Sequence, residues 1–279
     1  MTSHQSSNEE QVEFWNGPTA ESWVASQERM DQLLVTLSEQ AIQRAAPQPG
    51  ERVLDIGCGC GSTSLTMAGQ GARVTGVDIS EPMLANARAR SAGNEMLEFI
   101  LADASSHPFD TRFDLAFSRF GVMFFADPHQ AFAHIRSAIQ DQGRLCFICW
   151  QSPKDNPWLS VPGGAAQPFL PEPEAQPDPR APGPFAFADP AYVQEILDQA
   201  GFTSIAIEPC SADMRLGSDV EEAVAFLLRN GPMSRVLAEV DEDLRNKALD
   251  AVRETLAPLA TAEGIMLSGA CWIASANQG

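Results

Sequence analysis

The chain contains one stretch that combines an acid with closely spaced glycines. Asp55 ends a short apolar run, and Gly57, Gly59 and Gly61 follow at every second position. Glycine lets the backbone adopt positive φ and lets a ligand approach where a Cβ atom would collide. Ser62 stands where a dinucleotide-binding Gly-x-Gly-x-x-Gly loop needs its third glycine. An acid at the strand end suits a ligand with an ammonium group better than a pyrophosphate. The pattern therefore predicts a cofactor loop.

Three further apolar runs end near polar residues that we expect to lie beside this loop. The second run ends at Asp78, about 20 residues after the glycines, where an acid can accept hydrogen bonds from both ribose hydroxyls. The third and fourth runs, 97–101 and 113–117, are followed by Asp103 and Ser118. Parallel strands present their carboxyl ends at one edge of an open sheet, where ligands bind. The sequence thus predicts a site for a nucleoside with a free 2′-hydroxyl.

In order and spacing, these motifs resemble those of class I S-adenosylmethionine-dependent methyltransferases, from about Phe14 to Trp150. The matching elements are Asp55-x-Gly57-x-Gly59-x-Gly61, Asp78-Ile79-Ser80 with Pro82-Met83-Leu84, Asp103-Ala104, and Phe113-Asp114 before Ser118. The segments Phe14-Trp15-Asn16-Gly17-Pro18 and Ala270-Cys271-Trp272-Ile273 resemble bacterial small-molecule enzymes of the ubiquinone/menaquinone-biosynthesis type. The resemblance implies an α/β fold: a Rossmann-like sandwich with a mainly parallel seven-stranded sheet, an antiparallel last strand, and a cover of helices and loops.

The resemblance also implies how S-adenosyl-L-methionine, or the product S-adenosyl-L-homocysteine, is bound. Asp55 and the loop backbone would hold the methionine ammonium and carboxylate, and Asp78 would hold the ribose. Ile79 and Met83 would enclose the adenine, whose exocyclic amine would donate to Asp103. Ser118 would lie beside the sulfonium, and the Ala104 N–H would donate to the ring. The expected cofactor-binding residues are Trp23, Asp55, Gly57, Cys58, Gly59, Gly61, Asp78, Ile79, Met83, Asp103, Ala104 and Ser118.

The segment before the loop predicts a cap over the cofactor. Trp15 and Trp23 stand in a helical apolar pattern, and an aromatic face near a sulfonium stabilises it by about 0.5–2 kcal/mol. The alternative, that both rings only dock this helix on the sheet, stays open. Arg119, directly after Ser118, could clamp the carboxylate of an acceptor or could pair with an acid of the protein.

No catalytic base is assigned. Methyl transfer from a sulfonium is an in-line displacement that alignment promotes, with effective molarities worth up to about 7–11 kcal/mol. A base is needed only to remove a proton from a phenol, acid or amine acceptor. The histidines near the predicted edge, His107, His129 and His134, are interpreted as solvated surface residues.

Composition narrows the possible partners. The formal net charge of −19 repels phosphate backbones, so we expect a small-molecule acceptor and no nucleic acid. No run of about 20 apolar residues could span a bilayer, and the polar, acidic N-terminus resembles neither a signal peptide nor an anchor, so a cytoplasmic location is expected. Cys146 and Cys149 are three apart in a predicted strand and should face opposite ways, so no metal site is predicted. The oligomeric state, monomer or homodimer, is left open.

The expected organisation has five segments. They are a disordered tail at 1–10, a helical cap at 11–46, a cofactor-binding core at 47–150, a proline-rich loop or partly ordered lid at 151–190, and 191–279, which completes the sheet and carries inserted cover helices at 218–263. The predicted lid holds eleven of the twenty prolines. A helix is expected at 131–139, ended by Gly143, and another at 191–200, ended by Gly201. The last strands are expected at 204–210 and 270–276.

The predicted function is transfer of a methyl group to oxygen, nitrogen, sulfur or carbon of a small molecule. A non-catalytic module that binds S-adenosylmethionine or S-adenosylhomocysteine would keep every motif. A nicotinamide-dependent oxidoreductase would share the sheet, but it needs a glycine at Ser62 and has no use for Asp55 or Asp103.

Overall fold

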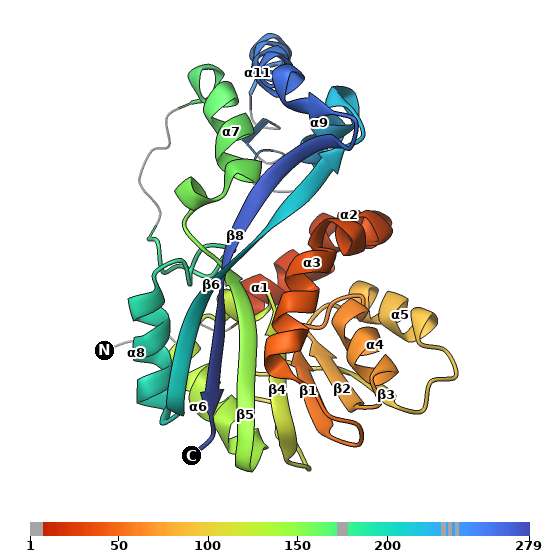
Figure 1. Ribbon diagram of the computed structural model, residues 1–279, viewed down its shortest axis with the longest axis vertical. Coiled ribbons are helices and arrows are strands. Elements are labelled where there is room, and N and C mark those ends of the chain that lie inside the picture. Colours follow the sequence, from red (N-terminus) through yellow and green to blue (C-terminus); the bar gives the residue numbers. More distant parts are fainter. Residues whose placement is uncertain (1–7, 172–177, 230–232, 234–235, 238–239) are drawn as a thin grey trace. The chain divides into compact units, whose positions relative to one another are not determined.

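The computed structural model describes residues 8–171, 178–229, 233, 236–237 and 240–279 (Figure 1). The chain divides into two compact units. The first comprises Met1–Trp150, Pro179–Cys210 and Cys271–Gly279, and the second comprises Gln151–Asp178 and Ser211–Ala270. Of the tail expected at 1–10, residues 1–7 lie outside the described residues, and Glu9 already begins a helix.

The sheet has the order β3-β2-β1-β4-β5-β8-β6, and a two-residue strand, β7, pairs with β8 (Figure 1). Strands β1 to β5 pair in parallel, whereas β8 runs antiparallel to β5. The strands are β1 (Arg52–Ile56), β2 (Arg73–Asp78), β3 (Leu97–Leu101), β4 (Phe113–Arg119), β5 (Ile139–Trp150), β6 (Thr203–Gly217), β7 (Ala260–Thr261) and β8 (Gly264–Asn277). This confirms the predicted α/β fold with a mainly parallel sheet and an antiparallel last strand.

Helices cover both faces of the parallel strands. Helices α3, α4 and α5 contact one face, and α6, with α8 packed against it, contacts the other (Figure 1). Strand β5 alternates between these layers: the Cys146 thiol contacts the carbonyl of Ala41 in α3, whereas Phe147 meets Phe132 of α6. The helices of the first unit are α1 (Glu9–Asn16), α2 (Pro18–Ala25), α3 (Gln27–Ala45), α4 (Ser62–Gly69), α5 (Glu81–Arg90), α6 (Pro128–Ala138) and α8 (Pro190–Ala200).

Helix α8 ends at the glycine that the sequence predicted. The Asp189 carboxylate accepts from the Ala191 N–H at the start of α8, and Gly201 ends this helix at φ +85°. The predicted end of α6 was wrong. Helix α6 ends at Ala138, and Gly143 lies inside β5, where a Cβ would come within 2.4 Å of Ile139. A register shift between β4 and β5 requires that glycine.

The last two strands are longer than expected. Strand β6 continues to Gly217 and carries the chain into the second unit, and β8 begins at Gly264 and brings it back. The sequence prediction stopped at 210 and restarted at 270, which are the residues at which the chain passes between the units. Beyond Cys210, polar and apolar side chains alternate along β6, so the apolar run that indicated this strand ends there.

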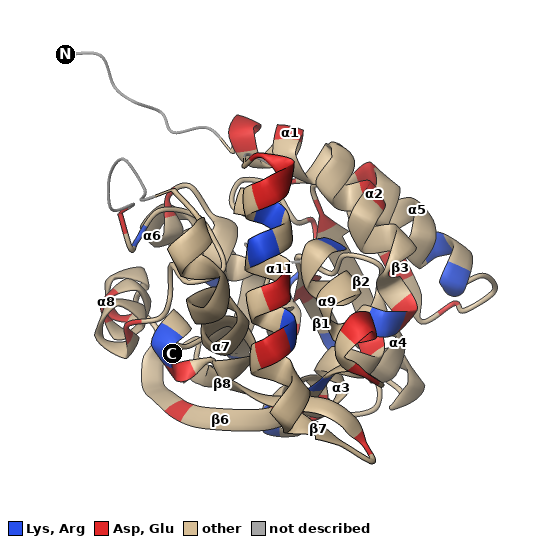
Figure 2. Ribbon diagram, turned by 90° about the horizontal axis from the view of Figure 1, so that it is seen from above, with Lys and Arg blue, Asp and Glu red and all other residues tan. Residues whose placement is uncertain are grey.

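The second unit contains helices α7 (Pro157–Ala166), α9 (Val220–Arg229) and α11 (Glu242–Leu256), and short 3₁₀ turns. Helix α11 packs against α7 and α9. Helix α7 lies in the segment predicted as a loop or partly ordered lid, so that segment is helical in part. Helix α11 carries side chains of both charge signs (Figure 2). Its Arg253 pairs with Glu221 of α9 at 2.9 Å.

Asn156 forms hydrogen bonds with both ends of the second unit. Asn156 is fully buried, and its amide donates to the carbonyls of Gln151, Ser152 and Ala270. Its oxygen accepts from the Ala270 N–H at 2.9 Å and from Trp158 Nε1 at 3.1 Å. This side chain thus bridges the first and last residues of the unit, which the Gln151 N–H also joins directly by donating to the Ala270 carbonyl at 3.0 Å.

Candidate cofactor site at the strand carboxyl ends

The glycine loop leaves β1 with an unusual backbone. Gly57, Gly59 and Gly61 all have positive φ, at +64°, +55° and +78°. At Gly57 an added Cβ would lie 2.7 Å from the Cα of Gly121, which follows β4. Glycine is thus required at 57 both by the left-handed conformation and by the close approach of two chain segments. The structure places this loop at the carboxyl end of β1, as predicted.

Asp55 is enclosed beneath the loop. It is fully buried, and its Oδ2 accepts from the hydroxyls of Thr63 and Ser64 in the first turn of α4 at 2.8 and 2.5 Å. Its Oδ1 is buried without a hydrogen-bond partner. Burial raises the pKa of Asp55 from 3.8 to about 6, although the hydrogen bonds from Ser64 and Thr63 act in the opposite direction. In this conformation its charge acts on the loop through space rather than by direct contact.

Asp78 lies at the neighbouring strand end and is half-buried. One carboxylate oxygen accepts from the Gly59 N–H at 2.8 Å, and the other accepts from the Ser80 N–H at 2.9 Å. A carboxylate offers about four acceptor positions, so each oxygen of Asp78 keeps one for a ligand hydroxyl. Burial raises the pKa of Asp78, whereas backbone hydrogen bonds from Ser80, Gly59 and Ile79 lower it.

Asp103 follows β3 and meets the N-terminus of the described chain. Its Oδ1 accepts from the Ser105 N–H at 2.8 Å, and its Oδ2 accepts from Asn8 Nδ2 at 2.6 Å. The Asn8 oxygen in turn accepts from the Ala126 N–H. Ala104, the expected partner of the adenine ring, is buried beside Asp103. Sequence reasoning did not find Asn8, because no local pattern indicates a partner 95 residues away.

A second asparagine attaches α1 to the loop after β2. Asn16 Nδ2 donates to the Ile79 carbonyl at 2.9 Å, and its oxygen accepts from the Glu81 N–H at 3.0 Å, at the first turn of α5. Its place in the segment Phe14-Trp15-Asn16-Gly17-Pro18 was noted from the sequence without a role for the side chain.

An apolar cluster joins the N-terminal helices to the loop. Met83 and Cys60 are buried together with Ala20, and Trp15 and Trp23 pack against them. The two indole rings meet edge to face at 6.1 Å. The structure therefore brings together Trp23, the glycine loop and Met83, three of the expected site elements from different parts of the chain. The rings dock the helices here, and whether Trp23 also faces a cofactor stays a prediction.

The end of β4 holds Ser118, Arg119 and Phe120. The buried Ser118 hydroxyl donates to the Ile56 carbonyl at 2.8 Å and accepts from the Gly121 N–H at 3.2 Å, so it fastens the β4 end to β1. Phe120 has a φ of +61°, which is rare for a side chain of this size, and its ring stacks on Trp150 at 4.5 Å. Backbone strain of this kind is common at functional edges.

The three histidines lie outside this group of residues. His134 Nε2 contacts the His107 carbonyl at 2.8 Å, and the ring of His129 approaches Tyr192 of α8. They belong to α6 and to the loop after β3. Cys146 and Cys149 point to opposite layers, as predicted, because the Cys149 thiol contacts the Phe187 carbonyl. Among the described residues no group of three or more potential metal ligands occurs.

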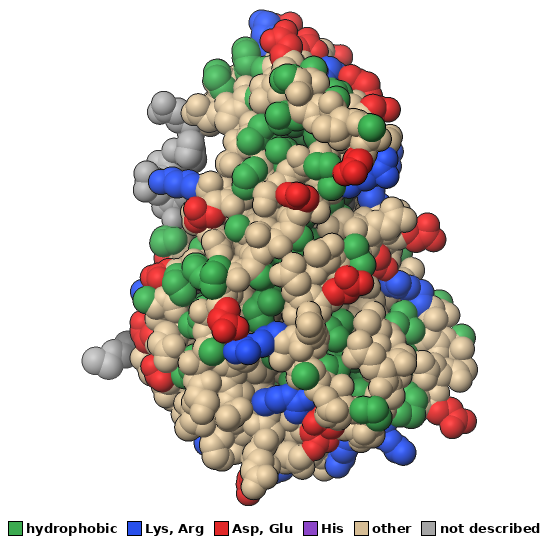
Figure 3. Space-filling model, in the orientation of Figure 1, with side chains coloured by type: hydrophobic (Ala, Val, Ile, Leu, Met, Phe, Trp, Pro, Cys, Tyr) green, Lys and Arg blue, Asp and Glu red, His purple; other side chains and the backbone are tan. Residues whose placement is uncertain are grey.

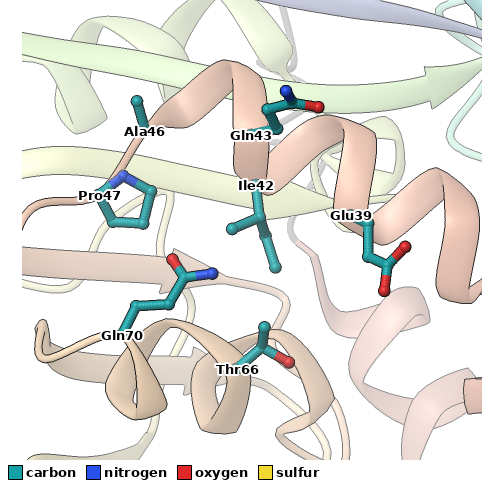
Figure 4. A pocket seen from close by; sticks show the side chains of 7 residues that line it. All are labelled: Glu39, Ile42, Gln43, Ala46, Pro47, Thr66 and Gln70. Atoms are coloured by element: carbon teal, nitrogen blue, oxygen red, sulfur yellow. The ribbon is translucent and has the colours of Figure 1, made fainter.

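A separate hollow lies between α3 and α4 (Figure 4). Ile42 points from α3 toward α4, and Thr66 and Gln70 point back from α4; none of the expected cofactor residues lines it. On the face shown in Figure 3, basic and acidic side chains are interspersed, and the described residues form no continuous basic patch there. No helix in the described ranges is both long and apolar enough to cross a bilayer.

The strand order, the positive-φ glycine loop after β1, and the acids near the carboxyl ends of β1, β2 and β3 are those of the fold of class I S-adenosylmethionine-dependent methyltransferases. Residues 54–147 match the family model described as a methyltransferase domain. Residues 54–147 are therefore similar to a methyltransferase domain, in agreement with the sequence motifs.

Two curated relatives and one solved structure illustrate the similarity. A demethylmenaquinone methyltransferase of Clavibacter sepedonicus is 35% identical over 124 residues, which are 44% of this chain and 49% of the relative. An O-methyltransferase of Penicillium expansum is 28% identical over 82% of this chain and 77% of its own length. Phosphoethanolamine N-methyltransferase 2 of Haemonchus contortus, solved with S-adenosyl-L-methionine, has a TM-score of 0.53 at 19% identity, covering 87% of this chain and 52% of that one. The chain thus spans about half the length of the first relative, and the structural likeness concerns the fold.

Proposed function

We propose that this protein transfers a methyl group from S-adenosyl-L-methionine to a small-molecule acceptor. The observation that supports this most directly is the convergence of Asp55, Asp78 and Asp103 on one sheet edge, around a loop whose glycines have positive φ. Phosphate-binding loops present amides to an anion, whereas this edge presents carboxylates, which suits a cationic, hydroxyl-bearing ligand. The site therefore fits the adenosyl sulfonium better than a nicotinamide dinucleotide.

We assign shares in cofactor binding to the expected residues as follows. Asp78 is half-buried and keeps one free acceptor position on each oxygen, which fits the two hydroxyls of a ribose. We assign Ile79 and Met83 to an apolar surface for adenine, with Asp103 and Ala104 as its hydrogen-bonding partners. Asp55 contributes negative charge beneath the loop, which favours the methionine ammonium.

When bound, S-adenosyl-L-methionine supplies an electrophilic methyl group on a sulfonium. The residues of this chain bind and orient: Asp78 fixes the ribose, the aromatic rings of Trp15 and Trp23 exclude water from the loop, and Ser118 holds the β4 end against β1. We assign no proton transfer to a side chain, because the histidines belong to α6 and the loop after β3. Orientation is the main contribution to such a displacement. The acceptor and its reacting atom are left open.

Calorimetry with S-adenosylhomocysteine tests the proposal. We expect binding that Asp78→Ala weakens about 10- to 100-fold, because two ribose hydroxyls lose a charged acceptor. Asp110→Ala, at an exposed position, serves as the control and should leave affinity unchanged. Tight binding of NADH without binding of S-adenosylhomocysteine would contradict the proposal. An unchanged affinity in Asp78→Ala would contradict the ribose assignment.

A screen of phenols, amines, thiols and carboxylic acids for release of S-adenosylhomocysteine tests catalysis. Turnover with any of them supports the methyltransferase. If none of these compounds causes release of S-adenosylhomocysteine although the cofactor binds tightly, the result would favour a non-catalytic binding module. That is the second function that the motifs allow.

A further inference from the structure

Most backbone N–H groups of the glycine loop already donate hydrogen bonds within the protein. The N–H groups of Gly57 and Cys58 both donate to the Val77 carbonyl, at 2.8 and 3.2 Å. The Gly59 N–H donates to Asp78, and the Gly61 N–H donates to the Cys58 carbonyl. These four amides are therefore occupied within the protein. The expectation that the loop backbone holds the methionine carboxylate of the cofactor needs a different donor.

The first turn of α4 is a poor alternative. The Asp55 carboxylate lies against it, held by the hydroxyls of Thr63 and Ser64. A ligand carboxylate placed at this helix start would face a like charge in a buried environment, where repulsion is strong. The methionine carboxylate of the cofactor therefore needs a positively charged side chain near the loop.

Two arginines carry positive charge close to the loop. Arg90 is already engaged, since it donates to the Cys60 carbonyl at 2.8 Å and pairs with Asp31 at 2.6 Å. Arg119 leaves the end of β4 on the side of α3, and its Nη1 donates to the neutral Ser38 hydroxyl at 3.0 Å. Within the described chain no carboxylate lies in salt-bridge distance of Arg119.

The backbone of Arg119 is fixed beside the loop. The preceding Ser118 bonds to Ile56, and the Phe120 N–H donates to the Ile148 carbonyl at 3.1 Å. Burial lowers the pKa of the Arg119 guanidinium, and the nearby Asp31 and Asp55 raise it. An arginine keeps its charge even so, because its ordinary pKa is far above neutrality. The protein thus holds a desolvated cation next to the loop with only a neutral side-chain partner.

We infer that Arg119 binds the carboxylate of the methionine moiety of the cofactor. The inference rests on the proposed function and assigns a residue that the sequence had linked only to an acceptor carboxylate or an internal acid. A guanidinium and a carboxylate form short, charge-assisted hydrogen bonds that gain strength when water is excluded. Arg119 therefore makes the site selective for adenosyl thioethers that carry a carboxylate.

A pair of ligands tests this assignment. S-adenosylhomocysteine and its decarboxylated analogue, an adenosyl thioether with a 3-aminopropyl chain, share the adenosine, the sulfur and the amine. We expect the wild-type protein to bind S-adenosylhomocysteine at least 10-fold more tightly. Arg119→Gln should weaken S-adenosylhomocysteine about 10- to 100-fold and change the affinity of the analogue less than about 3-fold. The ratio of the two affinities is the readout, because a structural role for Arg119 would not move it.

Arg90→Gln is the matched control, because it removes a structural cation beside the same loop. It should weaken both ligands alike and leave their ratio unchanged. Equal losses for both ligands in Arg119→Gln, or a wild-type ratio near one, would overturn the inference while S-adenosylhomocysteine binding would still support the proposed function. If neither ligand binds the wild-type protein, the proposed function fails, and this inference with it. If Arg119→Gln does not fold, the same ratio of affinities is measured for Arg119→Lys and for the wild-type protein. A wild-type ratio near one, or equal losses for both ligands in Arg119→Lys, would then overturn the inference.

Discussion

Replacing Asp55 with asparagine probes the electrostatics beneath the glycine loop. The carboxylate is fully buried, with Oδ2 bonded to two hydroxyls and Oδ1 without a partner. Asparagine keeps the shape, and its oxygen can still accept from Thr63 and Ser64. The substitution removes the titrating charge. It also places an amide NH2 group at the buried Oδ1 position, which changes stability by an amount that does not depend on pH.

The structure gives the size and direction of the effect. Burial raises the pKa of Asp55 from 3.8 to about 6 in the folded protein. A difference of about 2 pKa units corresponds to about 3 kcal/mol of folding free energy. Below about pH 4 the carboxyl is protonated in both states and costs nothing, whereas above about pH 6 the folded state carries a buried charge. Relative to Asp55→Asn, the wild-type protein should lose about 3 kcal/mol of stability as the pH rises through this window.

Urea unfolding followed by tryptophan fluorescence, from about pH 3.5 to 7.5, covers this window and measures the difference. Subtracting the free energy of unfolding of Asp55→Asn from that of the wild type cancels the titration of the other carboxyl groups. Asp141→Asn, whose parent side chain is 89% exposed, is the control and should give a flat difference. A flat difference for Asp55→Asn as well would refute the reasoning that burial of this carboxyl penalises its ionised form.

Three further outcomes are expected. Gly57→Ala should destabilise the protein by about 2–5 kcal/mol in urea unfolding, because positive φ and a backbone atom 2.7 Å from the new Cβ both oppose it. Gly93→Ala, at positive φ but in open space, should cost only about 1–2 kcal/mol, and equal losses would contradict the contact. Cys210 should be the first thiol to react with iodoacetamide in peptide mapping, because a hydrogen bond with Cys271 lowers its pKa; earlier labelling elsewhere argues against this. Asn156→Ala should destabilise the second unit by about 2–5 kcal/mol, and unchanged hydrogen exchange there would disprove its bridging role.

The sequence predicted the sheet and the position of the site well, because both depend on local patterns. An apolar run that ends in an acid and glycines is visible without any tertiary contact, and parallel strands must present such ends at one edge. The order of the motifs also identified the class of methyltransferase. The sequence missed β6 beyond Cys210, where polar and apolar residues alternate and no apolar run indicates the strand, and it also missed β8 before Ala270.

The roles of individual site residues depend on partners far away in the chain. Asp103 meets Asn8 across 95 positions, and Arg119 meets Ser38 across 81. The sequence predicts Gly143 as a helix end. In the structure Gly143 lies at a register shift between β4 and β5, which exists only because these two strands pair.

The sequence by itself determined that a glycine loop and three acids follow consecutive strands, because strand periodicity and glycine conformation are local properties. Only the tertiary structure decided that Asp55 is sealed under α4, that the loop amides are already bonded, and that Arg119 keeps a neutral partner. Burial and hydrogen-bond satisfaction are properties of the packed chain. They set which charges are left to bind a ligand, and no segment specifies them alone.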